Sequence, residues 1–561
     1  MRFKFLVLYA AYLLSGFAAV VYEIVWAREL TQVIGASLYA VSTVTGLFLG
    51  GLALGAAAAG RLCARQTWSA TAPPGLRMFA AFEIIIAAYG ILMPVAFRAD
   101  TQEALWSALS IGDPTASTVA RILYAALLIV PATAFMGATF PVLVAAVGSK
   151  TARGAEWLYT VNTIGGAAGA LGCGFLLLPQ LGLQASSWLA AGLHIVAAIV
   201  SIMVARRCAE VESPPDAVGA PDNAWNAGAP GPPPDNDRLR RQVARTAIIG
   251  ALFSGLLFMV YEIVSMRLLS LVLGSSTYSM STVLALLIAG LAVGSALSTR
   301  FLLPWRQPLL LSAAVLTACA VYGCVFIYSA DGLPWSFLAT FKLLQAIFPE
   351  HIVFVSLLSR VAVASLVVAV PSLLSGMVFP LLLSIFDEAD KARRTFFVGL
   401  LSAANNAGCI AGAFITGFVL IPKLGELFDS GMQASLILYV CLLLTLSMYL
   451  FAAWSASYMS DKETRALTIG VAAFVAFAVM LDMVLFKPAW DKAMMSAGPS
   501  FYSPSEIARA NRDQFVQAVG SAGGAVMLFY REGLNSTITV EALARNNVMF
   551  LKNDGKVEAA L

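Results

Sequence analysis

The sequence predicts an all-α polytopic membrane protein with two parallel six-helix repeats, one extra span and a small C-terminal β-meander. Three observations lead to this fold class. Long apolar segments recur along most of the chain, the first half is repeated in the second, and the composition changes after residue 487. Together they predict a membrane bundle that carries a small extramembrane region at its C-terminal end.

Composition separates this chain from soluble proteins. Of its 561 residues, 60% are hydrophobic and 12% are charged, and the mean hydropathy is +0.83. Soluble globular chains carry about 45–50% apolar and about 25% charged residues, so a soluble enzyme, a disordered chain and a nucleic-acid binder are all disfavoured. The net charge of +4 indicates no polyanionic partner. Seven cysteines without a C-x-x-C pair, and two histidines, predict neither a disulfide framework nor a metal site, and no cofactor is expected.

Apolar segments of about 20 residues have the length that an α-helix needs to cross a bilayer. The first half contains six, at roughly 5–27, 37–60, 77–97, 119–147, 157–181 and 185–205. The second half contains six more and a thirteenth follows, at roughly 243–265, 276–300, 308–329, 357–386, 395–422, 434–455 and 466–487. The predicted domains are a first repeat (1–206), a Pro-rich linker (207–241), a second repeat (242–455), the thirteenth span (466–487) and a C-terminal region (488–561).

An internal repeat relates the two sets of six spans. At an offset of 239 residues, Val21-Tyr22-Glu23-Ile24-Val25 recurs as Val260-Tyr261-Glu262-Ile263-Val264. Six spans in each repeat preserve the orientation, so the repeats are expected to be parallel and related by an axis along the membrane normal. This layout resembles that of major-facilitator transporters, in which a binding site lies near the midplane. Further matched positions are Arg121 with Arg360, Phe140-Pro141 with Phe379-Pro380 and, at a slightly longer offset, Asn162 with Asn405.

Basic residues predict the orientation, because arginine and lysine are enriched in cytoplasmic loops. They precede the first span, flank the linker, and lie between alternate pairs of spans. We therefore expect a protein of a bacterial-type inner membrane with a cytoplasmic N-terminus and a flexible cytoplasmic linker. Thirteen spans place the C-terminus on the extracytoplasmic side. The basic residues in the first half and around the linker are Arg2, Lys4, Arg61, Arg65, Arg77, Lys150, Arg153, Arg206, Arg207, Arg238, Arg240, Arg241 and Arg245.

Charged side chains inside the apolar spans are the first candidates for a functional site. Such charges are costly to insert and usually face the bundle interior in pairs. Pairing across helices predicts an ion pair between Glu23 and Arg121 and its duplicate between Glu262 and Arg360. Three roles stay open: structural pairs that fasten each half, a substrate or proton site, and snorkelling at the membrane boundary.

Other polar residues in the spans extend the candidate site. Glu83 has Tyr322 as its counterpart, so it is expected to be an unpaired carboxylate and is a candidate proton site. Asn162 and Asn405 each begin an Asn-x-x-Gly-x-x-x-Gly segment, where small residues permit close helix packing. Tyr22 and Tyr261, which precede Glu23 and Glu262, could line a cavity or could be packing residues. The candidate solute-binding residues are Glu23, Glu262, Arg121, Arg360, Tyr22, Tyr261, Asn162 and Asn405.

The C-terminal region has a different character. The segment Ser503–Val519 predicts a short polar helix with Ser503 as its cap. Segments 525–530, 536–541 and 548–552 alternate in polarity like strands and are separated by turn residues. They predict a β-meander that is too small for an independent enzyme core.

The Tyr-Glu-Ile-Val segments, the doubled six-span layout and the segment 529–537 (Phe-Tyr-Arg-Glu-Gly-Leu-Asn-Ser-Thr) resemble the membrane-fused spermidine synthase-like family. The resemblance implies a transporter-like membrane region followed by a polyamine aminopropyltransferase-like domain. That domain opens with a small β-subdomain and continues as a Rossmann-like fold. Here the match ends at the β-subdomain, and the sequence contains no Gly-Gly-x-Gly-Asp-like loop for an adenosylmethionine-type donor. Whether the chain is an enzyme therefore stays open.

Three functions are consistent with these patterns. In the first, the protein binds or transports a small polar solute, such as a polyamine-like cation, between the two halves. In the second, it is the membrane module of an aminopropyltransferase whose catalytic domain is absent from this chain or supplied by another protein. In the third, it is a membrane scaffold that docks a separate catalytic or extracytoplasmic partner on the β-meander. The lipid bilayer is a partner in all three.

Overall fold

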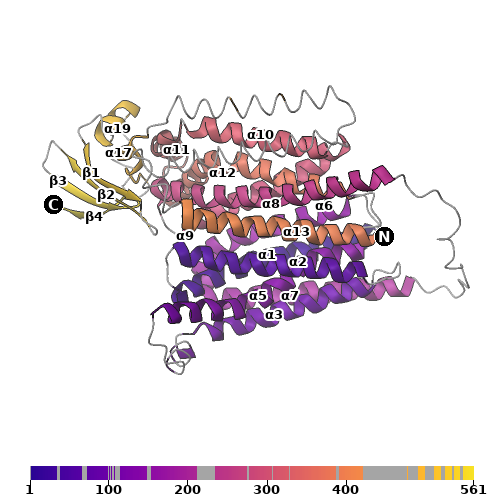
Figure 1. Ribbon diagram of the computed structural model, residues 1–561. Coiled ribbons are helices and arrows are strands. Elements are labelled where there is room, and N and C mark those ends of the chain that lie inside the picture. The colour runs from indigo at the N-terminus through magenta and orange to yellow at the C-terminus, as the bar shows by residue number, and fades with distance from the viewer. Residues whose placement is uncertain are drawn as a thin grey trace, which may run out of the picture.

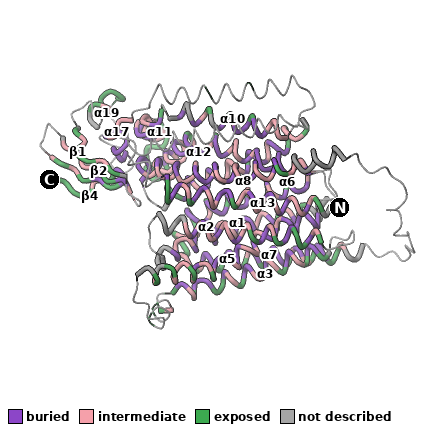
Figure 2. The backbone as a smooth tube through the Cα atoms, in the orientation of Figure 1, coloured by how far each residue is buried: buried purple, intermediate pink, exposed green. Residues whose placement is uncertain are grey.

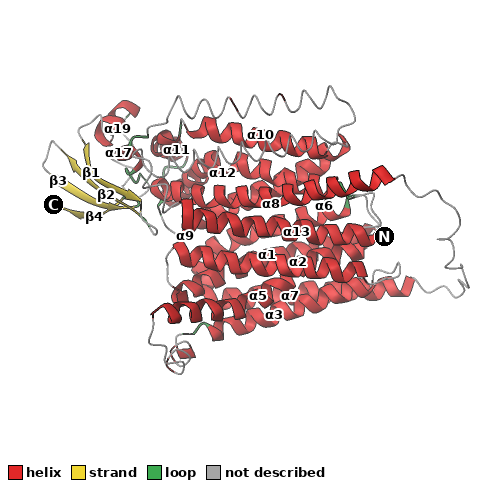
Figure 3. Cartoon of the chain, in the orientation of Figure 1, coloured by secondary structure: helices red, strands yellow, loops and turns green. Residues whose placement is uncertain are grey.

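The computed structural model is mainly helical, with a small sheet at one end (Figures 1 and 3). Two predicted spans, 434–455 and 466–487, lie outside the described residues except for positions 470 and 477, and stay predictions. The described residues are 2–34, 38–65, 73–98, 100, 101, 103, 107, 114–147, 153–211, 234–274, 277–305, 308–327, 329–386, 391–420, 470, 477, 490–499, 511–519, 525–532, 536–543 and 548–561.

The first half is a set of long apolar helices. A single apolar helical stretch covers Gly154–Cys208, more than twice the length of about 20 residues that a crossing needs. Gly182 interrupts this stretch with a φ of 72°, a left-handed conformation that glycine adopts without steric cost, and so divides it into two crossings. The helices are α1 (Arg2–Ile34), α2 (Leu38–Arg65), α3 (Pro73–Ala96), α5 (Pro114–Val147), α6 (Gly154–Gly172) and α7 (Leu178–Val211).

The second half repeats this arrangement. Among the described residues, nine apolar stretches are long enough to cross a membrane, with α6 and α7 counted together. Every span predicted before residue 422 falls on a helix. The helices are α8 (Pro234–Leu273), α9 (Thr277–Leu297), α10 (Pro308–Ile327), the short α11 (Leu333–Ile347), α12 (Ile352–Ser384) and α13 (Lys391–Phe414).

The structure shortens the predicted linker. Helix α7 continues to Val211 and α8 begins at Pro234, so both helices extend into the segment 207–241 that was expected to be flexible. The arginines in these extensions are good helix formers. Proline is tolerated in the first turn of a helix, because the backbone N–H that it lacks would have no partner there.

The two halves share their internal packing, which identifies them as structural repeats. Helix α1 packs on α6 and α2 on α5, and in the same way α8 packs on α13 and α9 on α12. The predicted close approach of the Asn-x-x-Gly segments is present, because a Cβ on Gly16 would meet the backbone of Asn162 and a Cβ on Gly255 would meet that of Asn405. The described helices therefore form the predicted all-α double bundle of two structural repeats.

Both halves also contain a π-helical turn at the same place in the repeat. These turns are η1 (Cys173–Leu177) after α6 and η5 (Ile415–Leu420) after α13. Each includes a Gly-Phe pair, at 174–175 and at 417–418. A π-helical turn accommodates an extra residue within a helix and often occurs at functional sites.

Contacts between the halves run along α2 with α13 and α6 with α9. Figure 2 shows buried residues distributed along the helices of the bundle. At the end of the bundle that carries the N-terminus, Arg153 donates to the Thr299 carbonyl oxygen at 2.9 Å. Near it, the Arg394 Nη2 and Glu156 Oε2 atoms lie 3.8 Å apart. These contacts join the two halves at this end of the bundle.

The C-terminal region forms a four-stranded antiparallel sheet in the order β1-β2-β3-β4, at the end of the bundle opposite the N-terminus (Figure 1). The predicted meander is confirmed, but the sequence interpretation missed β4. Asp554 (φ 47°) and Gly555 (φ 78°) are both left-handed, which is the geometry of a tight hairpin turn and continues the sheet. The strands are β1 (Ala525–Glu532), β2 (Thr537–Leu543), β3 (Val548–Asn553) and β4 (Lys556–Ala560).

Two short helices, α17 (Lys492–Met495) and α19 (Arg512–Val519), lie beside the sheet. Asn511 caps α19: its side-chain oxygen accepts from the Gln514 N–H at 2.8 Å, and the Gln514 side chain accepts from the Asn511 N–H at 2.9 Å. This reciprocal pair is a capping box. The cap expected at Ser503 lies outside the described residues.

A buried ion pair ties α17 to the sheet. Lys552 Nζ lies 2.6 Å from Glu541 Oε2, and their side chains are 9% and 5% exposed. Lys552 also donates to the Ser496 carbonyl oxygen at 3.3 Å, and the Ser496 hydroxyl donates to Glu541. The sheet contacts the membrane bundle at Gly555, which approaches the backbone of Leu271 at the end of α8.

Asp331, in the turn η4 (Ala330–Gly332) before α11, provides a pH-dependent contribution to stability. Partial desolvation and the nearby Asp491 raise the pKa of its carboxyl group. With a folded-state pKa above the unfolded value of about 3.9, this contribution is fully present below that value and is lost as pH rises through the folded pKa. Asp331→Asn is therefore expected to raise the midpoint of thermal unfolding at neutral pH and to leave it unchanged below about pH 4.

The measurement is thermal unfolding of the purified chain at both pH values. Glu103→Gln, at an exposed helical position between α3 and α5, is the matched control and is expected to change neither midpoint. A larger stabilisation by Asp331→Asn at acidic pH than at neutral pH would contradict the assignment.

Candidate functional site

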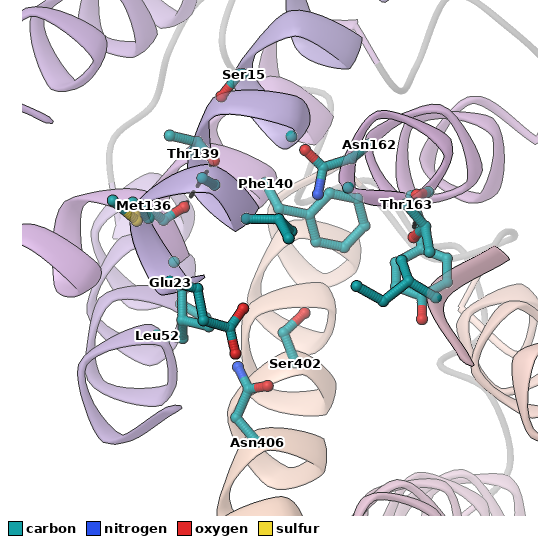
Figure 4. Close-up of a pocket in the computed structure, with 18 of the residues that line it drawn as sticks. Ser15, Glu23, Leu52, Met136, Thr139, Phe140, Asn162, Thr163, Ser402 and Asn406 are labelled. Carbon is teal, nitrogen blue, oxygen red and sulfur yellow. Dashed lines mark hydrogen bonds between the residues drawn. The ribbon is translucent and has the colours of Figure 1, made fainter. Parts of the chain in front are cut away.

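A cavity of about 300 Å³ lies between the two halves (Figure 4). Helices α1, α2, α5 and α6 line it from the first half, and α9, α12 and α13 line it from the second. Its wall combines apolar side chains with polar groups that could contact a solute. The polar lining residues are Tyr12, Ser15, Glu23, Thr139, Tyr159, Asn162, Thr163, Ser402, Asn405 and Asn406.

Glu23, on α1, is the charged residue among the described residues that line the cavity. Its side chain and that of Asn406, on α13, point toward one another across the interface (Figure 4). Among the described residues, no basic side chain forms an ion pair with Glu23. An ionised carboxylate within a membrane bundle is costly unless it is paired or solvated, so this carboxylate is suited to a cation from the cavity.

Glu262 is the repeat counterpart of Glu23 on α8, but it does not belong to the described cavity lining. The two carboxyl groups nevertheless interact electrostatically across the interface between the halves. Cys409, on α13, interacts with both of them. The duplication has therefore placed two acidic groups near the axis that relates the halves.

The predicted ion pairs are wrong. Among the described residues, Glu23 forms no ion pair with Arg121, and Glu262 forms none with Arg360. Arg360 instead donates to Ser279 Oγ at 3.2 Å. Both arginines lie near the N-terminal ends of their helices, α5 and α12. A helical side chain leans toward the N-terminus of its helix, which here carries it away from the glutamates in the middle of the bundle.

Of the other predicted site residues, some line the cavity and others pack within one half. Asn162 and Asn405 line the cavity. Tyr261 does not, since its hydroxyl donates to the Val367 carbonyl oxygen at 2.5 Å within the second half. Tyr22 is fully buried between two rings, with Trp26 at 4.6 Å and His194 at 5.3 Å between ring centroids.

Glu83 is not the unpaired carboxylate that its sequence asymmetry suggested. Its Oε2 lies 2.6 Å from His194 Nδ1, and its Oε1 accepts from Ser15 Oγ at 2.8 Å. The sequence interpretation missed His194, although a histidine within an apolar span is a recognisable signal. It also missed Asn406 and Thr163, whose signal is a polar side chain next to a candidate asparagine.

The duplicated bundle and its central cavity define a multi-pass membrane protein of transporter-like layout. No protein-family model matches the chain, and no curated protein matches it. Solved structures with a similar arrangement include the human organic anion transporter MFSD10 (TETRAN), with 13% identity, 80% of this chain and 99% of that chain covered, and a TM-score of 0.46. A bacterial homologue of the iron transporter ferroportin, in an outward-facing state, has 14% identity, covers 81% of this chain and 100% of its own, and has a TM-score of 0.48.

Proposed function

We propose that this protein transports a small, positively charged polar solute, such as a polyamine-like cation, through the cavity between its halves. The Glu23 carboxylate carries this proposal, because it lines the cavity and has no ion-pair partner among the described residues. A cavity of about 300 Å³ is at the lower end of ligand-pocket volumes, which favours a compact solute.

The neighbouring groups suit a hydrogen-bonding cation. An ammonium group donates up to three hydrogen bonds, and the Glu23 carboxylate and the side-chain oxygens of Asn162 and Asn405 are acceptors. The tyrosine rings at positions 12 and 159 could add cation–π attraction. Because the lining comes from both halves, movement of one half against the other would change access to a bound solute, as in other transporters with parallel repeats.

Orientation is part of the proposal. The N-terminus and the helix ends at Val211 and Pro234 lie at one end of the bundle, and the sheet lies at the other (Figure 1). The arginines at the first end support a cytoplasmic position for it in a bacterial-type inner membrane, with the sheet on the extracytoplasmic side. The aminopropyltransferase-module and scaffold hypotheses stay predictions.

Glu23→Gln tests the proposed function. Hydrogen bonds to charged groups contribute about 1.5–3 kcal/mol, so loss of the charge is expected to weaken spermidine binding and uptake by about tenfold or more. Spermidine serves as the probe of a compact organic cation, with uptake measured in proteoliposomes. The matched control is Glu103→Gln, which removes an exposed carboxylate between α3 and α5 and is expected to leave uptake unchanged. Equal uptake by a folded Glu23→Gln variant and the unchanged protein would refute the proposal.

A further inference from the structure

A fully buried carboxylate–imidazole pair lies in the first half, beside the cavity. Glu83 comes from α3 and His194 from α7, and their side chains are both 0% exposed. His194 Nδ1 is 2.6 Å from Glu83 Oε2. Two ionisable groups without solvent are costly to bury, so a pair of this kind requires an explanation.

Ser15 connects this pair to the cavity. Its hydroxyl donates to Glu83 Oε1 at 2.8 Å, and the same residue belongs to the cavity lining. Ser15 is therefore in contact with the buried carboxylate through its hydroxyl and belongs to the wall of the cavity. A hydroxyl both donates and accepts hydrogen bonds, so it can relay a proton.

Aromatic rings pack against the His194 side of the Glu83–His194 pair. Tyr22 stacks on His194 with an interplanar angle of 16°, and Trp26 stacks on Tyr22 at 12°. Within the described part of the chain, His194 Nε2 and the Tyr22 hydroxyl have no hydrogen-bond partner. A doubly protonated imidazole would need an acceptor at Nε2. The arrangement therefore suits a His194 that donates through Nδ1 to the Glu83 carboxyl group, and an ionised Glu83 would be a buried negative charge.

Other titratable groups surround this charge. From α1, Tyr12 and Tyr22 interact electrostatically with Glu83. From α5, the residue beside Tyr12 is Thr139, whereas the basic residue of that helix, Arg121, lies near its other end. Tyrosine and threonine side chains carry no positive charge, so none of these nearby groups offsets a charge on Glu83. Uptake of one proton would remove the cost of burying that charge.

We propose that Glu83 and His194 form a buried proton-binding site that exchanges its proton with the cavity through Ser15. A proton from cavity water binds Ser15 Oγ as the original Ser15 proton moves to Glu83 Oε1. One O–H bond forms on Glu83, one breaks on Ser15 and is replaced, and the carboxylate becomes a carboxylic acid. Release follows the reverse path. Proton binding requires no solute, so this site stands or fails independently of the proposed transport function.

The second half provides an internal comparison. Tyr322 replaces Glu83 there, and its hydroxyl donates to the carbonyl oxygen of Leu366 on the neighbouring helix α12. Ser254, the counterpart of Ser15, is buried without such a carboxylate at the matching position. The duplication thus supplies a matched hydroxyl that lacks the proposed proton acceptor.

The first experiment measures protonation directly. The full chain in lipid bilayers is titrated between about pH 5 and pH 9, and the infrared C=O band of a protonated carboxylic acid is followed. A band that grows on acidification is expected, and it should be lost in Glu83→Gln and shifted in its titration midpoint in His194→Gln. Persistence of the same titrating band in Glu83→Gln, or a band that does not titrate in the unchanged protein, would overturn the proposal.

The second experiment tests the route through Ser15. Trp26 fluorescence after a rapid pH change reports on the ring stack beside His194, with Trp26→Phe identifying its share of the signal. Positioned proton-transfer groups contribute about 10²–10⁴-fold to rates, so Ser15→Ala is expected to slow the response by about 100-fold or more. Ser254→Ala should respond like the unchanged protein. Equal rates for Ser15→Ala and Ser254→Ala would exclude the Ser15 route.

Discussion

Gly55→Ala is expected to destabilise the first half strongly, and Gly294→Ala should do the same in the second. A Cβ on Gly55 would meet the backbone of Ala134 on α5, and a Cβ on Gly294 would meet the backbone of Leu373 on α12. A clash with backbone cannot be relieved by a side-chain rotation, so the helices must separate. Overpacking of this kind costs about 1–3 kcal/mol and sometimes more.

Unfolding of the purified variants in detergent measures this cost. Gly192→Ala on α7 is the matched control, because a Cβ there has no atom within 4 Å. Alanine is better than glycine within a helix by about 0.5–1 kcal/mol, so this control should be slightly stabilised. Stabilities of Gly55→Ala and Gly294→Ala equal to that of Gly192→Ala would contradict the packing described for both halves.

Lys552→Met is the second substitution with a large expected effect, and it acts on the C-terminal sheet. It leaves Glu541 buried without the cation that lies 2.6 Å from it. Removal of one member of a buried ion pair costs about 3–5 kcal/mol, because the other charge remains desolvated. The sheet is therefore expected to open far more often, which hydrogen exchange of residues 525–561 would measure.

The control for Lys552→Met is Lys556→Met. Lys556 pairs with Glu558 at 3.1 Å, but these side chains are 55% and 45% exposed, and exposed pairs contribute about 0–1 kcal/mol. A second comparison combines Lys552→Met with Glu541→Leu, which replaces the pair with apolar groups and should recover much of the lost protection. Equal exchange in the two lysine variants would show that the buried pair does not hold the sheet.

Sequence periodicity predicted the parts of the fold that depend on local pattern. The apolar spans, the repeat and the close approach of Gly16 to Asn162 follow from residue spacing along single segments. The fourth strand was missed because Asp554-Gly555 reads equally well as a terminal turn or as a hairpin. That choice depends on pairing with β3, which no local pattern shows.

The candidate site was predicted only in part, because its geometry depends on contacts between distant segments. Glu23, Asn162 and Asn405 line the cavity as expected. The pairing of Glu83 with His194 joins residues 111 positions apart, so no spacing rule indicates it. The predicted glutamate–arginine ion pairs were wrong because opposite charges were matched without regard to the depth at which each side chain lies in the bundle.

The paired π-helical turns η1 and η5 bear on the history of the chain. A π-helical turn accommodates one extra residue. Two such turns occupy matching positions after α6 and α13, whereas a third, η2 (Ser298–Leu302), has an α-helical counterpart in α2. Inheritance from one ancestral half explains both with a single insertion, which dates that insertion before the gene duplication. The Glu83–His194 pair has no such twin at Tyr322, so the two copies have since diverged at this position.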